Sequence, residues 1–351
     1  MIPPGSTIGI MGGGQLGRML AVAAAQLGYR SHIYAPGASG PASEVAARWT
    51  NGAYDDAAAV AAFAAQVDVV TYEFENVAVD ALRGLANVRP GVRALEVAQD
   101  RLAEKHFAAE HGGTPAPFRP VNSADELRAA LDELGGPAIL KTRRMGYDGK
   151  GQARINDPGE AAAAWLKIGG RPAVLEGLVA FEAEYSIILA RGPDGAVVRW
   201  PAATNQHKDG ILHRSVVPSH GIVAAQEAAA AALATRFAEA LDYVGVLACE
   251  FFAGADGPVF NEMAPRVHNS GHWTIEGAVV SQFENHIRAV CGLPFGSTAL
   301  AGQGADMVNL LGNDVRTWST ILSDPAAHLH LYGKGEARPG RKMGHVTRVV
   351  R

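Results

Sequence analysis

A glycine-rich turn directly after the first predicted strand is the feature that most constrains the fold. The predicted strand Thr7–Met11 is followed by the letters GGGQLG, and an alanine-rich helix is predicted over residues 16–27. Backbone N–H groups at such a helix N-terminus form an anion site. Further strands at 32–35 and 67–72 alternate with a helix at 56–65. The sequence therefore predicts βαβ units with a parallel sheet in the N-terminal part.

The same glycine spacing, G-x-G-x-x-G, also occurs in dinucleotide-binding folds. Those folds carry an acidic residue at the end of the second strand, where it binds the adenosine ribose. Here the second strand ends with the letters HIYAP, and no acidic residue follows before Glu44. This disfavours an NAD site. A tight turn without a ligand, and a site for a phosphate or small substrate without NAD, both stay open.

Composition excludes several classes of protein. The 351 residues suit two or three domains, and a hydrophobic share of 48% excludes intrinsic disorder. The charged residues are 31 Lys and Arg against 35 Asp and Glu, so there is no basic excess for a nucleic-acid backbone. Two cysteines, Cys249 and Cys291, suit a reducing compartment better than a disulfide scaffold. With neither a signal peptide nor an apolar run near 20 residues, we expect a cytoplasmic protein without a membrane partner.

A predicted hairpin at residues 245–264 places two glutamates face to face. With a central turn, simple antiparallel pairing puts Glu250 opposite Glu262 and Phe252 opposite Phe260. Two carboxylates directly across a strand pair repel each other, and burial among phenylalanines increases that cost. A divalent cation would remove the conflict, and oxygen-only ligands favour magnesium, which manganese can replace. The alternative is that one glutamate turns to solvent or pairs with the arginine that follows the hairpin.

Polar residues follow this hairpin in the segment MAPRVHNSGH. His268 and His272 are four residues apart, a spacing that can bind zinc on a helix. Asn269, Ser270 and Gly271 disfavour a continuous helix there, and no cysteine or third histidine lies nearby. A loop of polar groups that converges on a substrate is therefore favoured over a zinc site.

A second glycine-rich loop follows the predicted strand Ala138–Thr142. It contains three glycines within six residues, and the basic residues Lys141 and Lys150 flank it. The N–H groups of such a loop can surround phosphates, although the sequence does not match a Walker A loop. A solvated basic hairpin is the alternative reading of the loop alone. Taken together with Glu250 and Glu262, the two lysines indicate a nucleoside triphosphate bound with magnesium.

Six short motifs are spread over nearly the whole length of the chain. They are GGGQLGRM at 12–19, YEFEN at 72–76, KTRRMGYDGKGQ at 141–152, NQHKDGILHRS at 205–215, NEMAPRVHNSGHWT at 261–274 and RPGRKMGH at 338–345. The set resembles the ATP-grasp superfamily, and more closely the 5-(carboxyamino)imidazole ribonucleotide synthetase family of purine biosynthesis. The motif that ends in HNSGHWT is the specific one.

The resemblance implies an α/β fold of ATP-grasp architecture in four parts. These are an N-terminal Rossmann-like pre-ATP-grasp domain at 1–97, a small lid domain at 98–180, an ATP-grasp domain with the metal hairpin at 181–295, and a C-terminal α+β part at 296–351. It also implies a reaction. ATP phosphorylates bicarbonate to carboxyphosphate, ADP leaves, and the amine of aminoimidazole ribonucleotide takes up the carboxylate. A homodimer without nucleic-acid partners is expected.

By position, the resemblance assigns residues to ATP and to magnesium. The residues implied for ATP are Arg101, Lys141, Gly146, Tyr147, Asp148, Gly149, Lys150, Gly151, Gln152, Glu176, Gly177, Leu178, Val179, Glu184, His207, Asn261 and Glu262. Among them, the stretch 176–179 is expected at adenine and Glu184 at the ribose hydroxyls. Glu250 and Glu262 are expected to hold magnesium.

The residues implied for the ribonucleotide form a second set: Gln15, Leu16, Glu73, Tyr147, Lys150, Arg266, His268, Asn269, Ser270, Arg338 and Lys342. Arg266 and His268 are the candidates for stabilising carboxyphosphate. Asp148 and Glu73 are the candidates for holding or deprotonating the amine.

Two other functions stay open. One is another ATP-grasp ligase with an acyl-phosphate intermediate, such as the formate-dependent glycinamide ribonucleotide enzyme. The other is a non-catalytic nucleotide-binding regulator of the same fold. The intact pair Glu250 and Glu262 argues against a regulator, because a pure binder has no need to orient a reactive phosphate.

Overall fold

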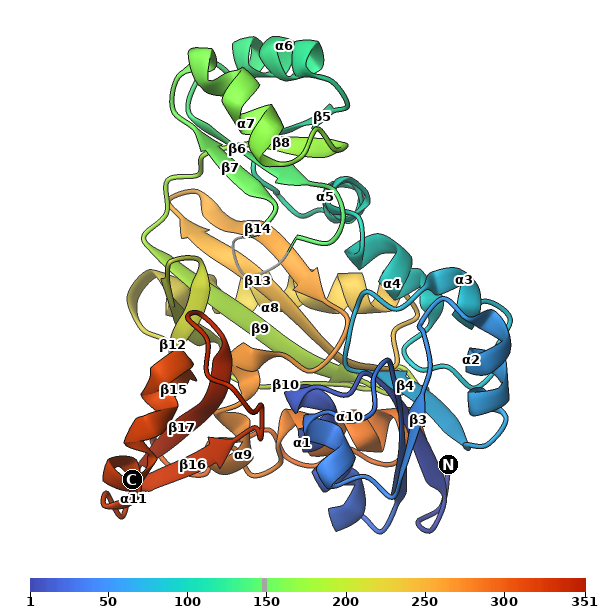
Figure 1. Cartoon of the computed structure of the whole chain (residues 1–351). Coiled ribbons are helices and arrows are strands. Elements are labelled where there is room, and N and C mark those ends of the chain that lie inside the picture. The colour runs from blue at the N-terminus through green and yellow to red at the C-terminus, as the bar shows by residue number, and fades with distance from the viewer. Residues whose placement is uncertain (147–149) are drawn as a thin grey trace.

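The N-terminal part of the chain is a parallel α/β layer. The computed structural model describes residues 1–146 and 150–351, and that part of the chain forms three sheets (Figure 1). The first sheet has the strand order β3-β2-β1-β4, and all of its pairings are parallel. This confirms the predicted βαβ units. The elements are β1 (Thr7–Met11), α1 (Gln15–Gln26), β2 (Arg30–Ala35), η1 (Pro41–Glu44), β3 (Arg48–Asn51), α2 (Ala57–Ala64), β4 (Val69–Tyr72) and α3 (Val79–Leu82).

Two helices link this layer to the next. They are α4 (Val92–Ala98) and α5 (Arg101–Glu110). Asp100 lies between them and caps α5, because its Oδ1 accepts the N–H groups of Leu102 and Ala103 at 3.0 and 3.4 Å. A carboxylate cap of this kind satisfies N–H groups that a helix start leaves unpaired.

The second sheet forms a small layer with its own hydrophobic cluster, at the top of Figure 1. Its strand order is β5-β8-β6-β7. Buried residues such as Leu127, Leu140 and Leu175 fill the space between the sheet and its two helices. The elements are β5 (Phe118–Val121), α6 (Ala124–Leu134), β6 (Ala138–Thr142), β7 (Gln152–Ile155), η2 (Pro158–Glu160), α7 (Ala161–Lys167) and β8 (Ala173–Gly177).

The third sheet is the largest and runs through the rest of the chain. Its main path is β14-β13-β9-β11-β12-β15-β17-β16, and β10 pairs with β9. The first group of elements is β9 (Ala183–Arg191), β10 (Val197–Arg199), β11 (Ala203–Lys208), β12 (Ile211–Val217), α8 (Gly221–Ala240), β13 (Gly245–Gly254) and β14 (Gly257–Ala264). The second group is η3 (Asn269–Gly271), α9 (Thr274–Gly277), α10 (Gln282–Cys291), β15 (Gly304–Leu311), η4 (Gly312–Thr317), α11 (Trp318–Leu322), β16 (Ala327–Leu331) and β17 (Lys342–Val350).

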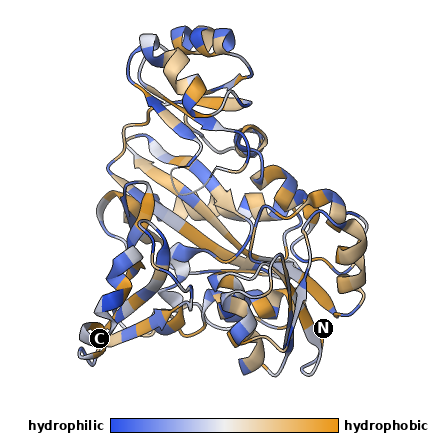
Figure 2. Ribbon diagram, in the orientation of Figure 1, coloured by the Kyte–Doolittle hydropathy of each residue, from blue (hydrophilic) through white to orange (hydrophobic). Residues whose placement is uncertain are grey.

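Alternate residues of β9 and β13 fill two clusters on opposite faces of this sheet. Even-numbered residues such as Ile188 and Val246 pack in the cluster that contains α1 and α10. Odd-numbered residues such as Ile187 and Leu247 pack with α8. These central strands are largely hydrophobic in Figure 2. Glu250 continues the even-numbered series of β13, so strand alternation points it to the face where the N-terminal layer lies.

The predicted hairpin is present, but its pairing slips by one residue. Glu250 does pair with Glu262, as predicted. The predicted pair of Phe252 and Phe260 is wrong, because Phe260 pairs with Phe251. The shift comes from a β-bulge at Asn261, the extra residue between the two registers.

The large sheet continues into the C-terminal part of the chain. β12 pairs with β15, and β15 pairs with β17 along most of its length. Before this part, α9 and α10 are two separate helices with residues 278–281 between them. In the described residues, no helix is both long and apolar enough to cross a membrane.

Candidate active site

One cavity of about 840 Å³ lies where the N-terminal layer, the second glycine-rich loop and the large sheet meet. That loop, of which the structure describes residues 143–146 and 150–151, is here called the lid loop. Its size is typical of a small-molecule site. It brings together predicted residues from both sets: Gln15, Leu16, Glu73, Arg101, Gly146, Lys150, Glu250, Glu262, Arg266, His268, Asn269, Arg338 and Lys342. Residues from the two ends of the chain therefore face the same space.

The opposed glutamates of the hairpin lie on its wall. Burial, together with the charge of Glu262, raises the pKa of Glu250 to about 7. Burial would raise the pKa of Glu262 as well, but the charges of Arg101 and Lys141 bring it below its ordinary value. Arg101 Nη1 donates to Glu262 Oε2 at 2.8 Å. At neutral pH the pair therefore holds one firm negative charge and one site that a proton or a cation can occupy.

A third carboxylate, which the sequence analysis did not assign, lies beside this pair. Glu104 on α5 is buried, and its Oε1 accepts the N–H of Met263 at 2.6 Å. Burial and the charge of Glu262 raise the pKa of Glu104 to about 8. Its carboxyl group is therefore largely protonated at neutral pH, so it adds a hydrogen-bonding group rather than a charge to the hairpin.

The first glycine loop holds a side chain of the protein itself. Gly14 N–H donates to Glu73 Oε1 at 2.7 Å. A Cβ at Gly12 would lie 2.5 Å from Glu73 Cγ, and one at Gly17 would lie 3.2 Å from the same atom. The glycine spacing is thus explained by the close approach of Glu73 to the start of α1, which leaves no need for a dinucleotide. Burial raises the pKa of Glu73, although the Gly14 hydrogen bond opposes this.

Arg266 and His268 project from the loop after β14. Arg266 Nε forms a short ion pair with Glu75, a residue of the YEFEN segment that the sequence analysis did not assign. Burial would raise the pKa of Glu75, but the charge of Arg266 and its hydrogen bond bring it below its ordinary value. Burial and the nearby charges of Arg266 and Lys342 lower the pKa of His268 well below its ordinary value, so this imidazole is neutral.

The protonated nitrogen of His268 follows from its contacts. Nδ1 accepts the N–H of Ser270 at 3.3 Å and lies 2.9 Å from Ser270 Oγ. The proton of the neutral ring is therefore on Nε2, which lies 3.4 Å from Glu250 Oε1. Ser270 is fully buried behind the ring, and the amide of Asn269 pairs with that of Asn309 at 2.8 and 2.9 Å. Both residues support the loop.

The zinc alternative at His268 and His272 is wrong. His268 lies at the cavity, whereas His272 is fully buried and packs against the rings of Phe283, Tyr332 and His345. Across the described ranges, no group of three or more His, Cys, Asp or Glu residues could hold a metal ion.

Several predicted ATP residues form two polar groups, one on the second sheet, here called the lid sheet, and one on the large sheet. Glu176 lies between two lysines, with Lys141 Nζ at 2.9 Å and Lys105 Nζ at 3.1 Å. His207 Nδ1 lies 2.6 Å from Glu184 Oε2 on the neighbouring strand. Burial would lower the pKa of His207, but the hydrogen bond and charge of Glu184 raise it. Lys105 is a residue that the sequence analysis missed.

The remaining predicted residues fall into two groups. Those outside the described lining of the cavity are Lys141, Gly151, Gln152, Glu176, Gly177, Leu178, Val179, Glu184, His207, Asn261 and Ser270. Tyr147, Asp148 and Gly149 lie outside the described residues. The lining residues that the sequence analysis did not assign are Gly14, Phe74, Glu75, Asn76, Ala98, Gln99, Glu104, Arg143, Met145, Ile211, Met263, Ala264, Lys334, Pro339, Gly340 and Arg341. Arg341 lies within the motif at 338–345 and Lys334 lies shortly before it, and a basic run was the only available signal there.

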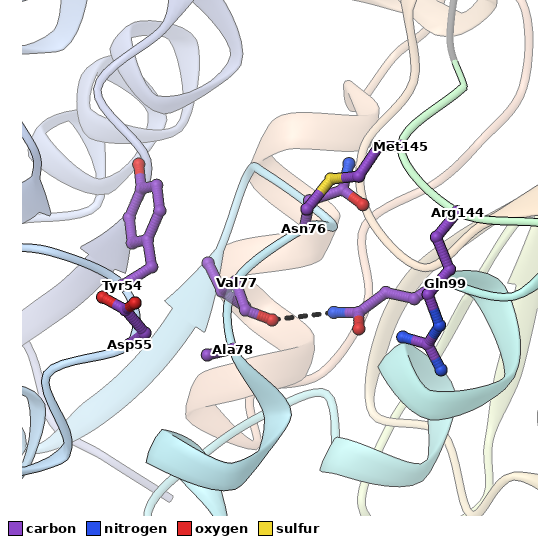
Figure 3. A pocket seen from close by; sticks show the side chains of 8 residues that line it. All are labelled: Tyr54, Asp55, Asn76, Val77, Ala78, Gln99, Arg144 and Met145. Carbon is purple, nitrogen blue, oxygen red and sulfur yellow. Dashed lines mark hydrogen bonds between the residues drawn. The ribbon is translucent and has the colours of Figure 1, made fainter. Parts of the chain in front are cut away.

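A smaller cavity of about 350 Å³ adjoins the main one beneath the lid loop (Figure 3). The two share Asn76, Gln99 and Met145. Gln99 Nε2 donates to the carbonyls of Glu75 and Val77 at 2.8 and 2.7 Å, which fixes the segment that carries Glu73.

The lid loop begins at a bidentate ion pair. Arg143 Nε and Nη2 donate to the two carboxylate oxygens of Asp100 at 3.0 and 2.6 Å. The residue that caps α5 therefore also anchors the start of the loop. Such two-point pairs are geometrically specific.

Family models match three successive parts of the chain. A ribonucleotide synthetase preATP-grasp domain matches residues 5–99, an ATP-grasp domain matches residues 106–283, and a phosphoribosylaminoimidazole carboxylase C-terminal domain matches residues 305–351. Together with the opposed glutamates and the lid sheet, these matches define an ATP-grasp enzyme, as the sequence predicted.

Individual relatives show which family of ATP-grasp enzymes this chain resembles. An N5-carboxyaminoimidazole ribonucleotide synthase of Brucella melitensis is 53% identical and covers 99% of this chain and 97% of its own length. The structure of the synthetase from Thermus thermophilus matches with a TM-score of 0.90 at 48% identity, over 98% of this chain and 93% of that one. The Aspergillus clavatus synthase, solved with ADP and 5-aminoimidazole ribonucleotide, matches with a TM-score of 0.92 at 31% identity, over 99% and 94%. The chain belongs to the N5-carboxyaminoimidazole ribonucleotide synthase family, whose members are ATP-grasp ligases.

Proposed function

We propose that this chain uses ATP and bicarbonate to carboxylate the amine of 5-aminoimidazole ribonucleotide. The observation that carries the proposal is the single cavity that Glu250 and Glu262 share with Glu73, Arg266 and His268. A site for a metal-bound phosphate and a set of groups suited to a ribonucleotide thus open to one space. The relative solved with ADP and 5-aminoimidazole ribonucleotide supports the same pair of ligands here.

We assign ATP to the polar groups around Glu176 and Glu184, which form the nucleotide end of the site. Lys141 supplies positive charge for the phosphates, and Arg101 links Glu262 to the carbonyl of Gly146 at the lid loop. The segment 176–179 is the proposed contact of the adenine, with Glu184 at the ribose hydroxyls. The side chain of Glu176 is already paired with Lys141, so its carboxylate orients that lysine.

Magnesium fits the hairpin. Two carboxylates face each other across the strand pair, and one of them has a pKa of about 7 without a cation. Glu250 and Glu262 would hold the ion, and the ion would neutralise charge on the phosphates of ATP. Phosphate oxygens and water are suitable further ligands, since magnesium sites commonly use only one or two carboxylates.

The proposed reaction has two steps, and side chains of the protein serve the second, the transfer of the carboxyl group. The terminal phosphoryl group of ATP moves to a bicarbonate oxygen, and ADP leaves. The amine nitrogen then attacks the carboxyl carbon, the bond from that carbon to the phosphate oxygen breaks, and phosphate leaves. In the proposed mechanism, Arg266 and the Nε2–H of His268 stabilise the carboxyphosphate oxygens. The amine proton goes to a carboxylate, for which Glu73 and Asp148 are the candidates.

The experiment is an assay of ADP release in the presence and absence of each substrate. With the purified chain, we expect bicarbonate and 5-aminoimidazole ribonucleotide together to give the full rate, and radiolabelled bicarbonate to enter the product. ADP release that depends on formate and glycinamide ribonucleotide would instead identify another ligase. ATP binding without turnover under all conditions would identify a regulator. A cytoplasmic location and a homodimer belong to the same proposal, and size-exclusion chromatography with light scattering tests the dimer.

A further inference from the structure

A buried glutamine contacts the loop that carries His268 and is itself not part of the described lining of the cavity. Gln282 is the first residue of α10, and its side chain is fully buried. The helix begins there because Ser281 caps it, with Ser281 Oγ accepting the N–H of Glu284 at 3.1 Å. The position of Gln282 is thus set by a helix start rather than by the loop.

The amide of Gln282 pairs with both main-chain groups of His268. Its Oε1 accepts the His268 N–H at 2.9 Å, and its Nε2 donates to the His268 carbonyl at 2.6 Å. Nε2 also lies 3.4 Å from Nδ1 of His272. A primary amide offers the same donor and acceptor as a peptide group, so one side chain replaces a strand partner for His268.

Two further contacts close the loop around this pair. Thr274 Oγ1 accepts the N–H of Gln282 at 3.0 Å and donates to the carbonyl of Gly271 at 2.6 Å. A Cβ at Gly271 would lie 2.8 Å from Cδ and Oε1 of Gln282. The glycine is therefore required for the amide to reach the peptide of His268.

The direction of the His268 ring depends on this backbone. His268 is extended, with φ −127° and ψ 152°, and its Nδ1 bonds to Ser270 two residues later. If the backbone at His268 shifts, the Nε2–H group moves away from Glu250 and from the cavity. A displacement of about 1 Å in a reacting group can cost about a hundredfold in rate.

We propose that Gln282 is a positioning residue for carboxyl transfer, which aims the Nε2–H of His268 into the cavity through paired hydrogen bonds to its backbone. This rests on the proposed function of the same site. In this role Gln282 acts on carboxyl transfer through the backbone of His268 and takes no part in ATP binding. The loss of these bonds should uncouple ADP release from carboxylation rather than abolish phosphoryl transfer.

The test compares Gln282→Met with Gln226→Met. Methionine keeps the length of the side chain but removes both hydrogen bonds. Gln226 is the matched control, because its Nε2 donates to the Gly254 carbonyl at 2.6 Å, at the turn end of β13 and away from the loop that carries His268. For Gln282→Met we expect the ratio of carboxylated product to ADP to fall about tenfold or more, with the KM for ATP within about twofold of wild type. Gln226→Met should keep the wild-type ratio.

A second readout addresses the geometry directly. The ¹⁵N NMR shifts of the His268 ring report which nitrogen carries the proton, and we expect Nε2–H in the wild type and a mixture of tautomers in the variant. If Gln282→Met is insoluble, Gln282→Asn keeps a buried amide that is one methylene shorter and withdrawn from the His268 peptide, so it should show the same changes. A soluble variant with a wild-type product ratio and wild-type ring shifts overturns the positioning role. A wild-type enzyme that does not carboxylate the ribonucleotide overturns the proposed function instead, while the ring shifts still test the geometry.

Discussion

His268 Nε2 lies 3.4 Å from Glu250 Oε1, so the donor proposed for carboxyl transfer touches the carboxylate pair proposed for magnesium. The contact between these two residues therefore brings the groups proposed for the two steps of the reaction next to each other. Carboxyphosphate is an unstable anhydride in water, and a short path from phosphoryl transfer to amine attack limits its loss. The two groups serve different steps of the proposed reaction. A change to His268 should therefore affect carboxylation, whereas a change to the carboxylate pair should affect phosphoryl transfer.

Replacing His268 by alanine should affect carboxylation more than phosphorylation. The Nε2–H of the neutral imidazole lies at the cavity, 3.4 Å from Glu250 Oε1, whereas Lys141 pairs with Glu176. We expect the affinity for ATP to stay nearly intact and the ratio of product to ADP to fall, because stranded carboxyphosphate would hydrolyse. If both rates fall together at an unchanged ratio, His268 acts at or before phosphorylation. If neither falls, the histidine is structural.

Replacing Glu262 by glutamine should reduce turnover by about a hundredfold or more at saturating magnesium. The fold should persist, because the new amide oxygen can still accept from Arg101 and one of two like charges is removed. Steady-state kinetics over a magnesium titration, together with a thermal melt, measure both effects. The exposed residue Glu239 on α8 provides the control Glu239→Gln. Near-normal turnover of Glu262→Gln would contradict the metal assignment.

Replacing Gly12 by alanine should destabilise the protein by about 1–3 kcal/mol. Gly12 has φ +116°, and a Cβ there would lie 2.5 Å from Glu73. Displacement of Glu73 should also raise the KM for the ribonucleotide, while the KM for ATP stays constant. Gly136→Ala is the control, since a Cβ there meets nothing within 4 Å. Equal unfolding midpoints of the two variants in urea would disprove the close approach.

Stability should fall with acidity through the buried His286. Its Nδ1 accepts the N–H of Val246 at 3.1 Å and its Nε2 lies 2.8 Å from Thr71 Oγ1, which links the central sheet to the N-terminal layer. Burial lowers the pKa of His286 from 6.5 to about 3. Below pH 6.5 the unfolded chain binds a proton that the folded chain does not. This contribution is therefore complete above pH 6.5 and is lost toward pH 3, at about 1.4 kcal/mol per pH unit.

The measurement for His286 is the urea midpoint between pH 8 and pH 4. His286→Gln should be less stable than wild type at pH 8, yet its midpoint should depend less steeply on pH below 6.5. The exposed His328 gives the control His328→Gln, which should keep the wild-type slope. An unchanged slope in His286→Gln would show that this histidine does not contribute to acid unfolding.

Local patterns predicted the parts of the fold that depend on neighbouring residues. The strands Thr7–Met11 and Ala138–Thr142 have the predicted bounds, because short apolar runs there end at glycine or charge. β11 and β12 were missed because polar residues interrupt their alternation. The slip at Asn261 was missed because counting opposed residues assumes one partner for each residue, which a bulge violates.

In the site, too, residues marked by a local motif were predicted, and residues defined by distant contacts were missed. Motif spacing found Glu250 and Glu262, because a hairpin brings its own strands together. Glu104 was missed because its partner Met263 lies 159 residues away, and the sequence contains no local sign of that contact. Gln282 was missed for a related reason: an amide that binds backbone atoms has no charge or motif to mark it. The roles of the predicted ligand-binding residues stay predictions.

The pairing of β12 with β15 matters for the construction of chimaeras between relatives. β15 lies inside the large sheet, with β12 on one side and β17 on the other. Exchanging residues 305–351 would therefore require one foreign strand, β15, to match the register and side-chain shapes of the resident strand β12. The lid sheet has its own hydrophobic cluster, and its three sheet pairings lie within residues 118–177. Recombination at the flanks of that segment would interrupt no strand pairing, so the lid is the part of this enzyme that can be exchanged as a unit.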